Sequence, residues 1–135
     1  MANAIYPLYK QSLLDADSNT DLNDGTVKVA LVDTGTYTYS ASDQFYSDLS
    51  GVVGTPVEIT NTTVANGVFD GDDVTFSAVS GSSAEALVIY IDTGSGSTSR
   101  LVAYIDTGVT GLPVTPNGGD ITVTWDSGSN KIFAL

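Results

Sequence analysis

Two stretches of this chain are nearly identical: Leu87-Val88-Ile89-Tyr90-Ile91-Asp92-Thr93-Gly94 and Leu101-Val102-Ala103-Tyr104-Ile105-Asp106-Thr107-Gly108. A Gly/Ser-rich segment, residues 94–99, joins them. An apolar run rich in Ile, Val and Tyr that ends in Asp and Gly is typical of a β-strand followed by a turn. The two copies therefore predict a central antiparallel hairpin with strands over 86–92 and 100–106.

The rest of the chain after residue 25 has the same β character. A third, looser copy, Val29 to Gly35, belongs to an apolar run over 26–33 that is typical of a strand buried on both faces. Short runs that are interrupted this often by Gly, Asn, Asp and Ser predict an all-β, single-domain antiparallel β-sandwich or barrel. Further strands are expected over 37–40, 56–60 (an edge strand, because of Pro56), 63–65 and 68–70 (a hairpin around Asn66-Gly67), 73–79, and 120–125 with 131–135 as a closing hairpin.

The N-terminal segment has a different pattern. Residues 1–25 are expected to form an N-terminal arm outside the β-sandwich domain, which would span 26–135. Residues 4–14 fit either a short helix, in which Pro7 lies in the first turn, or an extended arm. Both alternatives are open from the sequence.

A short helix is expected near 43–49. Ser42 or Asp43 can cap its N-terminus, Phe45 and Leu49 lie four residues apart, and a glycine follows as a stop signal. It would be the main helical element within the β domain.

Composition limits the function. The 135 residues include 16 Asp and Glu against 4 Lys and Arg, with neither His nor Cys, and the net charge is -12. Such a chain lacks the basic stripe that nucleic acid or an anionic membrane would bind, so a basic protein surface is the expected partner and a solvated acidic exterior is the alternative. Without His and Cys there is no Ser-His-Asp triad, disulfide or thiolate metal site. No apolar run reaches the length of a membrane span, and the N-terminus does not resemble a secretory signal, so synthesis and assembly in cytoplasm are expected.

The repeated Asp-Thr-Gly resembles the loop that presents a catalytic carboxylate in aspartic proteases. That chemistry needs two carboxylates that share a proton. In the predicted hairpin, Asp92 lies at the tip and Asp106 at the far end, about 20 Å apart for six residues of about 3.4 Å each. We therefore expect Asp33, Asp92 and Asp106 to serve in turns, no catalytic residue and no enzyme. A dimer that uses one copy from each chain is the protease alternative.

Two acidic segments carry side chains that could be calcium ligands. Residues 15–21 carry oxygen side chains at alternate positions, but Thr20 and Thr26 stand where an EF-hand loop has Gly and Glu. Asp70-Gly71-Asp72-Asp73 is a second cluster. We expect solvated turns, and assign no metal and no cofactor, although weak calcium binding stays open.

Five tyrosines near the arm and loops are candidate interface residues. Aromatic side chains in such positions are frequent interface anchors, and ordinary packing on the core is the alternative. The candidates are Tyr6, Tyr9, Tyr37, Tyr39 and Tyr46.

Several strings, in the same order along most of the chain, resemble a widespread family of structural proteins of tailed bacteriophages. The segments at 43–49 and 68–81 look like that family's short helix and central hairpin. The strings are Leu22-Asn23-Asp24-Gly25-Thr26-Val27-Lys28-Val29-Ala30-Leu31-Val32-Asp33-Thr34, Asp43-Gln44-Phe45-Tyr46-Ser47-Asp48-Leu49, Val68-Phe69-Asp70-Gly71-Asp72-Asp73-Val74-Thr75-Phe76-Ser77-Ala78-Val79-Ser80-Gly81, Glu85-Ala86-Leu87-Val88-Ile89-Tyr90, Asn117-Gly118-Gly119-Asp120-Ile121-Thr122-Val123-Thr124-Trp125 and Lys131-Ile132-Phe133.

The resemblance implies a β-rich virion protein, preferably a capsid decoration (cement) protein. Such a protein would lie on the capsid exterior, bind the lattice of the major capsid protein and stabilise the head. A homo-oligomer, trimer or dimer, is expected because three-fold and two-fold lattice points are where it would bind. The alternative is a binding module of the tail, fibre or baseplate, in which Trp125 and the loop tyrosines would stack on sugar.

Overall fold

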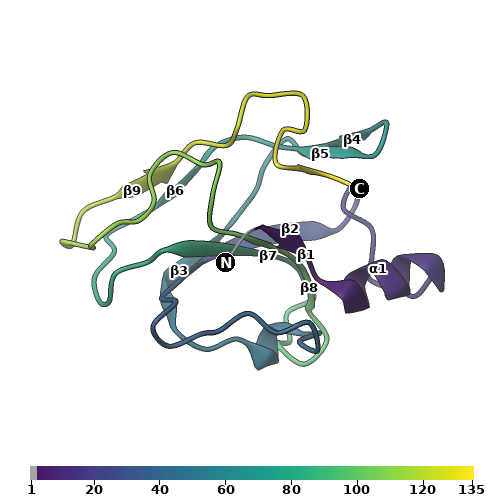
Figure 1. Ribbon diagram of the computed structural model, residues 1–135, viewed down its shortest axis with the longest axis horizontal. Helices are drawn as coiled ribbons and strands as arrows, with labels where there is room; N and C mark the ends of the chain where they lie inside the picture. The colour runs from purple at the N-terminus through teal and green to yellow at the C-terminus, as the bar shows by residue number, and fades with distance from the viewer. Residues whose placement is uncertain (1–2) are drawn as a thin grey trace.

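The two near-identical stretches form the central hairpin of the fold, as predicted. In the computed structural model, which describes residues 3–135, β7 (Ala86–Asp92) and β8 (Arg100–Ile105) pair antiparallel, with Leu87 opposite Ile105 and a register shift at Ile89/Tyr90. The other edge of β7 pairs along its whole length with β2 (Thr26–Val32). A five-stranded antiparallel sheet, the main sheet, results in the order β1-β8-β7-β2-β3, with β1 (Ala4–Ile5) and β3 (Val52–Glu58) at its edges (Figure 1).

The main sheet is covered on both faces, which explains why its central strands are continuous apolar runs. On one side lie two small sheets, one formed by β4 (Thr63–Ala65), β5 (Val68–Asp70) and β10 (Phe133–Ala134), the other by β6 (Val74–Phe76) and β9 (Ile121–Val123). On the other side lies the segment 33–51 (Figure 1). The architecture is therefore mostly antiparallel β, in layers, as the sequence predicted.

The pairing of the last strands differs from the prediction. The expected closing hairpin between 120–125 and 131–135 is wrong, because β9 pairs with β6 and β10 pairs with β5. In β6–β9 the apolar residues face each other, Val74 opposite Val123 and Phe76 opposite Ile121. The alternation of apolar and polar residues predicts a strand but not the strand with which it pairs. Here the paired strand is distant in the sequence.

Two local predictions for β-structure had opposite outcomes. The hairpin at Asn66-Gly67 is confirmed: both residues have positive φ, 54° and 75°, as a two-residue turn between twisted strands requires. The strand expected at 37–40 is absent, and these residues lie in the segment 33–51 that covers the main sheet.

The described part of the N-terminal segment contains both predicted alternatives. Residues 1 and 2 of the predicted arm lie outside the described range. β1 is extended and pairs with β8, and α1 (Pro7–Leu14) follows, with Pro7 in its first turn. The Tyr6 backbone N–H donates to the Val102 carbonyl oxygen at 3.0 Å, so this segment completes one edge of the main sheet.

The short helix expected near 43–49 is a single 3-10 turn, η1 (Tyr46–Asp48). Neither Ser42 nor Asp43 caps it. Instead the Asp48 carboxylate accepts hydrogen bonds from the backbone N–H groups of Gln44 (2.8 Å) and Phe45 (3.0 Å). A longer helix does not form because the segment bonds to β8 instead, for example from the Leu101 N–H to the Gln44 carbonyl oxygen at 2.9 Å. Within residues 3–135, no helix is long and apolar enough to cross a membrane.

Candidate functional site

Most of the tyrosines gather between the main sheet and the segment 33–51. Tyr90 and Tyr104 hold the same position in the two near-identical stretches, and both rings face this segment. The ring centroids are 4.6 Å apart for Tyr46 and Tyr90, and 5.5 Å for Tyr39 and Tyr104. We call this set the tyrosine layer; its members are Tyr6, Tyr37, Tyr39, Tyr46, Tyr90 and Tyr104.

Three of the five candidate interface tyrosines are buried inside the protein. The exposed fractions of Tyr6, Tyr9 and Tyr37 are 0%, 2% and 3%, so packing on the core, the alternative left open by the sequence, describes them. The Tyr37 hydroxyl donates to Asp43 at 2.6 Å, and the Tyr6 hydroxyl therefore donates to Tyr37 at 2.8 Å. Burial raises the pKa of Tyr6 and Tyr37, and it raises the pKa of Tyr9, on α1, to about 12.

Tyr39 borders a cleft at the start of β7, which we call the aromatic cleft. Its volume is about 450 Å³, within the range of binding pockets. The Tyr39 ring is half-buried and packs against the rings of Tyr6 (5.1 Å between centroids) and Tyr104 (5.5 Å). The lining residues are Thr34, Tyr37, Thr38, Tyr39, Glu85, Tyr104, Asp106 and Pro113.

The aromatic cleft has a negative electrostatic environment. Glu85 is held in place, because one of its carboxylate oxygens accepts hydrogen bonds from the backbone N–H and the hydroxyl of Thr34, each at 3.0 Å. Burial, followed by the charges of Asp106 and Glu85, raises the pKa of Tyr104. None of the four Lys and Arg residues, all within the described range, lines this cleft. Such a site favours a cationic group that can lie against aromatic rings.

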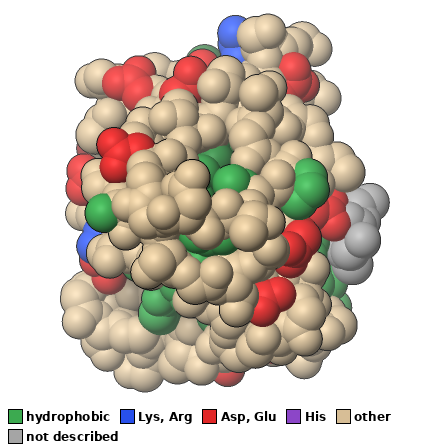
Figure 2. Space-filling model, turned by 90° about the vertical axis from the view of Figure 1, so that its left-hand side faces the viewer, with side chains coloured by type: hydrophobic (Ala, Val, Ile, Leu, Met, Phe, Trp, Pro, Cys, Tyr) green, Lys and Arg blue, Asp and Glu red, His purple; other side chains and the backbone are tan. Residues whose placement is uncertain are grey.

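The surface around the start of β7 also carries acidic side chains. Figure 2 shows Asp and Glu side chains spread over this side of the molecule, with hydrophobic side chains among them in the middle of the face. Lys and Arg side chains lie only near its margins in that view.

At the other end of the β7–β8 hairpin, the chain's own Arg100 occupies a comparable place, which we call the arginine site. The guanidinium lies 5.5 Å from the Phe45 ring centroid and its Nη2 lies 3.9 Å from the Asp17 carboxylate. Arg100 also donates to the Ser18 carbonyl oxygen at 3.1 Å and to the buried Ser12 hydroxyl at 2.9 Å. An aromatic ring, a carboxylate and oxygen acceptors thus hold one arginine of this protein.

Next to the arginine site, Lys28 pairs with Asp92 at the tip of the hairpin. The Lys28 ammonium lies 2.8 Å from the Asp92 carboxylate. This contact, followed by a hydrogen bond from the Gly94 N–H, holds the pKa of Asp92 below its ordinary value. The half-buried Tyr46, the fifth candidate interface residue, packs on Tyr90 here and lies away from Tyr39.

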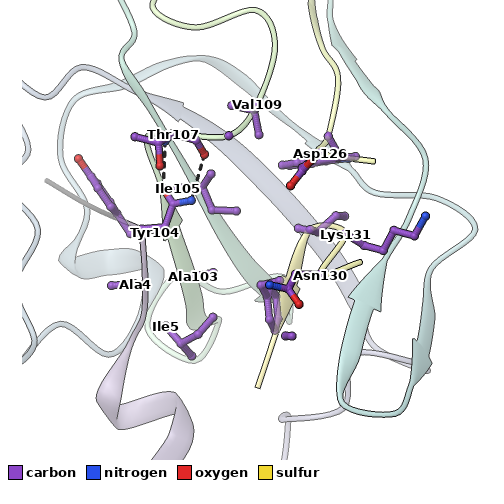
Figure 3. A pocket seen from close by; sticks show the side chains of 16 residues that line it. Ala4, Ile5, Ala103, Tyr104, Ile105, Thr107, Val109, Asp126, Asn130 and Lys131 are labelled. Carbon is purple, nitrogen blue, oxygen red and sulfur yellow. Dashed lines mark hydrogen bonds between the residues drawn. The ribbon is translucent and has the colours of Figure 1, made fainter. Parts of the chain in front are cut away.

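A second hollow, of about 300 Å³, lies between β1 and β8 of the main sheet and the C-terminal segment (Figure 3). Figure 3 shows Ile105 pointing into this groove and Tyr104 pointing away from it, so β8 separates the groove from the aromatic cleft. The Asn3 side chain, which also lines the groove, accepts hydrogen bonds from the backbone N–H groups of Asp106 and Thr107 at 2.7 and 3.0 Å.

Trp125, which lines the same groove, is held inside the protein. It is only 6% exposed, and its indole N–H donates to the Asp72 carbonyl oxygen at 2.9 Å. The expectation that Trp125 would stack on a sugar is therefore wrong, because its ring belongs to the core.

The Asp-Thr-Gly motifs serve in turns at two of three positions. Asp33 accepts a hydrogen bond from the Gly35 N–H at 2.8 Å, and Asp92 accepts one from the Gly94 N–H at 3.0 Å. Asp106 lies after β8, at the opposite end of the hairpin from Asp92. Within the monomer, Asp92 and Asp106 therefore cannot share a proton.

In the acidic cluster Asp70-Gly71-Asp72-Asp73, two carboxylates have structural roles. Asp72 accepts hydrogen bonds from the side chains of Asn61 (2.6 Å) and Thr60 (3.2 Å), and Asp73 accepts one from the Trp125 N–H (3.0 Å). In residues 3–135, no group of three or more His, Cys, Asp or Glu side chains is arranged to hold a metal ion.

No protein-family model matches this chain, and no curated protein sequence matches it. The sequence pattern and the geometry of the aromatic cleft therefore carry the inference of function.

Proposed function

We propose that this protein is a structural component of a bacteriophage particle, namely a capsid decoration protein that binds the lattice of the major capsid protein and stabilises the head. The observation that carries the proposal is where the phage-like strings fall in the fold. They cover the core elements in order: β2, η1, β5 and β6, β7, β9, and the start of β10. Turn residues alone recur in unrelated β proteins, whereas these strings include the central strands β2 and β7 of the main sheet and strands of both small sheets.

The layered fold suits a protein that must survive on the outside of a particle. β7 is buried from Ala86 to Ile91 because the small sheets cover one face of the main sheet and the segment 33–51 covers the other. A sheet covered on both faces exposes little backbone to solvent, which favours slow local opening.

The acidic exterior supports binding to a basic protein surface. With a net charge of -12, the protein would be steered toward positively charged patches and away from nucleic acid. In a symmetric homo-oligomer, a trimer or a dimer, several weak contacts with the lattice would add through avidity.

The proposal is tested with heads of the encoding phage prepared with and without the gene. Heads without the protein are expected to release DNA at a lower temperature, and addition of the purified protein is expected to restore the wild-type temperature. DNA release followed by dye fluorescence during heating measures the effect. Equal release temperatures for both kinds of head would contradict the decoration role.

A tail, fibre or baseplate binding module is the second candidate. The observation that favours it is the half-buried Tyr39 ring, which borders an open cleft and offers an aromatic surface of the kind that also stacks on sugars. Gold-labelled antibody bound only to tails in electron micrographs would favour this candidate over the decoration role.

A further inference from the structure

We infer that the aromatic cleft is the docking site for an arginine side chain of the partner protein. The identity of that partner, the major capsid protein, rests on the proposed function; the preference for arginine rests on the cleft itself. Tyr39, which packs on the buried Tyr104, supplies the aromatic surface, and Glu85 supplies the anchored carboxylate.

The charge of the cleft selects a cation. The carboxylates of Glu85 and Asp106 both line it, and after burial their charges raise the pKa of Tyr104. The lining contains no Lys or Arg of the described chain. Placing a positive group here adds an attraction to the carboxylates and to the faces of the rings.

The arginine site is an example, within this protein, of a guanidinium that packs on an aromatic ring. There, the chain combines a ring (Phe45), a carboxylate (Asp17) and oxygen acceptors around the planar group of Arg100. The aromatic cleft has the same kinds of group, and none of the described Lys and Arg side chains lines it. A guanidinium lies flat on a ring while its N–H groups bond to a carboxylate, which a lysine ammonium cannot do in the same way.

The cleft is preorganised for such a contact. Tyr104 is 3% exposed, and the Tyr39 ring packs against both Tyr6 and Tyr104. Glu85 is fixed by its two hydrogen bonds from Thr34. Because these groups are already ordered, little conformational entropy is lost when a partner binds.

The first experiment titrates the whole protein with N-acetyl-L-arginine amide and follows the ring resonances of Tyr39 and Tyr104 by NMR. Both are expected to shift in a saturable way, and N-acetyl-L-lysine amide is expected to bind more weakly. Glu85→Gln is expected to weaken arginine binding by about fivefold, as the loss of one charge contact does. Added salt is expected to weaken it further.

Glu58→Gln is the matched control, because Glu58 and Glu85 are the only glutamates and Glu58 is exposed on the edge strand β3. It removes the same charge and is expected to leave arginine binding unchanged. Tyr39→Leu keeps an apolar side chain in place, removes the ring, and is expected to weaken binding severalfold. Equal shifts with lysine and arginine, shifts with a neutral disaccharide instead, or equal loss in both Gln variants would overturn the inference.

The second experiment measures binding of the same variants to heads that lack the protein. If wild-type protein binds and Glu85→Gln and Tyr39→Leu bind about tenfold more weakly, the cleft is the docking site. If all variants bind as well as wild type, the inference is overturned while the decoration role stands. If wild-type protein does not bind heads but the arginine titration succeeds, the proposed function fails and the cation site stands.

Discussion

The two ends of the β7–β8 hairpin use similar chemical groups in different ways. At the tip, Lys28 neutralises Asp92, and Arg100 fills a site made by Phe45 and Asp17. At the opposite end, Glu85 and two tyrosine rings border an open cleft that no Lys or Arg of residues 3–135 lines. The first end is completed by the chain itself, and the second presents the same kinds of group to solvent.

The difference indicates a division between stability and recognition. Groups that satisfy one another inside the monomer contribute to folding, and groups that border an open cleft are available to a partner. Substitutions at the tip should therefore change the free energy of unfolding, and substitutions at the cleft should change binding.

Removal of the ring that supports the cleft is expected to have the largest effect on stability. Tyr6→Ala deletes a fully buried ring that packs on Tyr39 and is hydrogen-bonded to Tyr37. The expected loss is about 3–5 kcal/mol in the free energy of unfolding, measured by urea denaturation. Tyr46→Ala, at the tip, removes a half-buried ring and is expected to cost about 1–2 kcal/mol. A larger cost for Tyr46→Ala would contradict the order that burial predicts for the two rings.

The comparison is tested most directly by substituting the charged residue at each end. Arg100→Met is expected to cost about 2–3 kcal/mol, because the buried Ser12 hydroxyl and the Ser18 carbonyl oxygen lose their donor. Glu85→Gln is expected to change the free energy of unfolding by less than about 0.5 kcal/mol, since the amide oxygen can still accept from Thr34. Similar costs in urea denaturation for the two variants would remove the distinction between a structural end and a binding end.

Titration of the tyrosines at alkaline pH tests how strongly each ring of the tyrosine layer is buried. The pKa of each tyrosine in the layer is raised above its ordinary value of 10.0, mainly by burial, so the folded state retains protons that the unfolded state loses. Stability is therefore fully present below about pH 10 and is expected to fall as the pH rises above it. Urea midpoints measured from pH 8 to 12 test this.

The same titration separates the two ends when Glu85 is replaced. Glu85→Gln removes a negative charge that raises the pKa of Tyr104, so that pKa is expected to move down toward 10.0. The pKa of Tyr90, which is raised by burial and by Tyr46 and Asp92, is expected to stay unchanged. Site-resolved NMR titration of the two rings measures both, and a shift at Tyr90 as large as that at Tyr104 would contradict the assignment.

The smallest effect is expected at the Lys28–Asp92 pair. Lys28→Met removes an ion pair near the surface and is expected to cost at most about 1 kcal/mol, less at high salt. The folded-state pKa of Asp92 lies below its ordinary value, so the carboxylate stabilises the fold above about pH 4 and this contribution is lost as the pH falls through the folded-state value. Denaturation of both proteins between pH 2 and 6 should show a weaker dependence on acid in Lys28→Met.

The sequence predicted the central hairpin and the turns because those features are local. Repeated apolar runs set β7 and β8, and Asn66-Gly67 has the conformation that its residue types favour. The strands that pair with β9 and β10 could not be predicted, because the alternation of apolar and polar residues in a strand does not depend on its neighbour in the sheet. The helix expected near 43–49 is only the single turn η1, because backbone groups of this segment form hydrogen bonds with β8 and the residue before it.

The candidate site was predicted only in part. Tyr39 is one of the five candidate tyrosines of the sequence, whereas the sequence predicts only a strand at Tyr104, although its position matches that of Tyr90 in the repeat. Nothing in the sequence around Glu85 indicates a role in a site. Its position is fixed by hydrogen bonds from Thr34, which is distant in the sequence and which the main sheet places beside it. A site assembled from several segments of the chain is not visible in any one of them.

The pairing of β1 with β8 has a consequence for folding kinetics. One edge of the main sheet forms only when residues near the start of the chain meet residues beyond position 100, and the small sheets likewise join β5 to β10 and β6 to β9. Such distant contacts slow folding, and all-β proteins of this kind refold in milliseconds to seconds. Stopped-flow fluorescence of the buried Trp125 should therefore report a refolding phase much slower than closure of the β7–β8 hairpin.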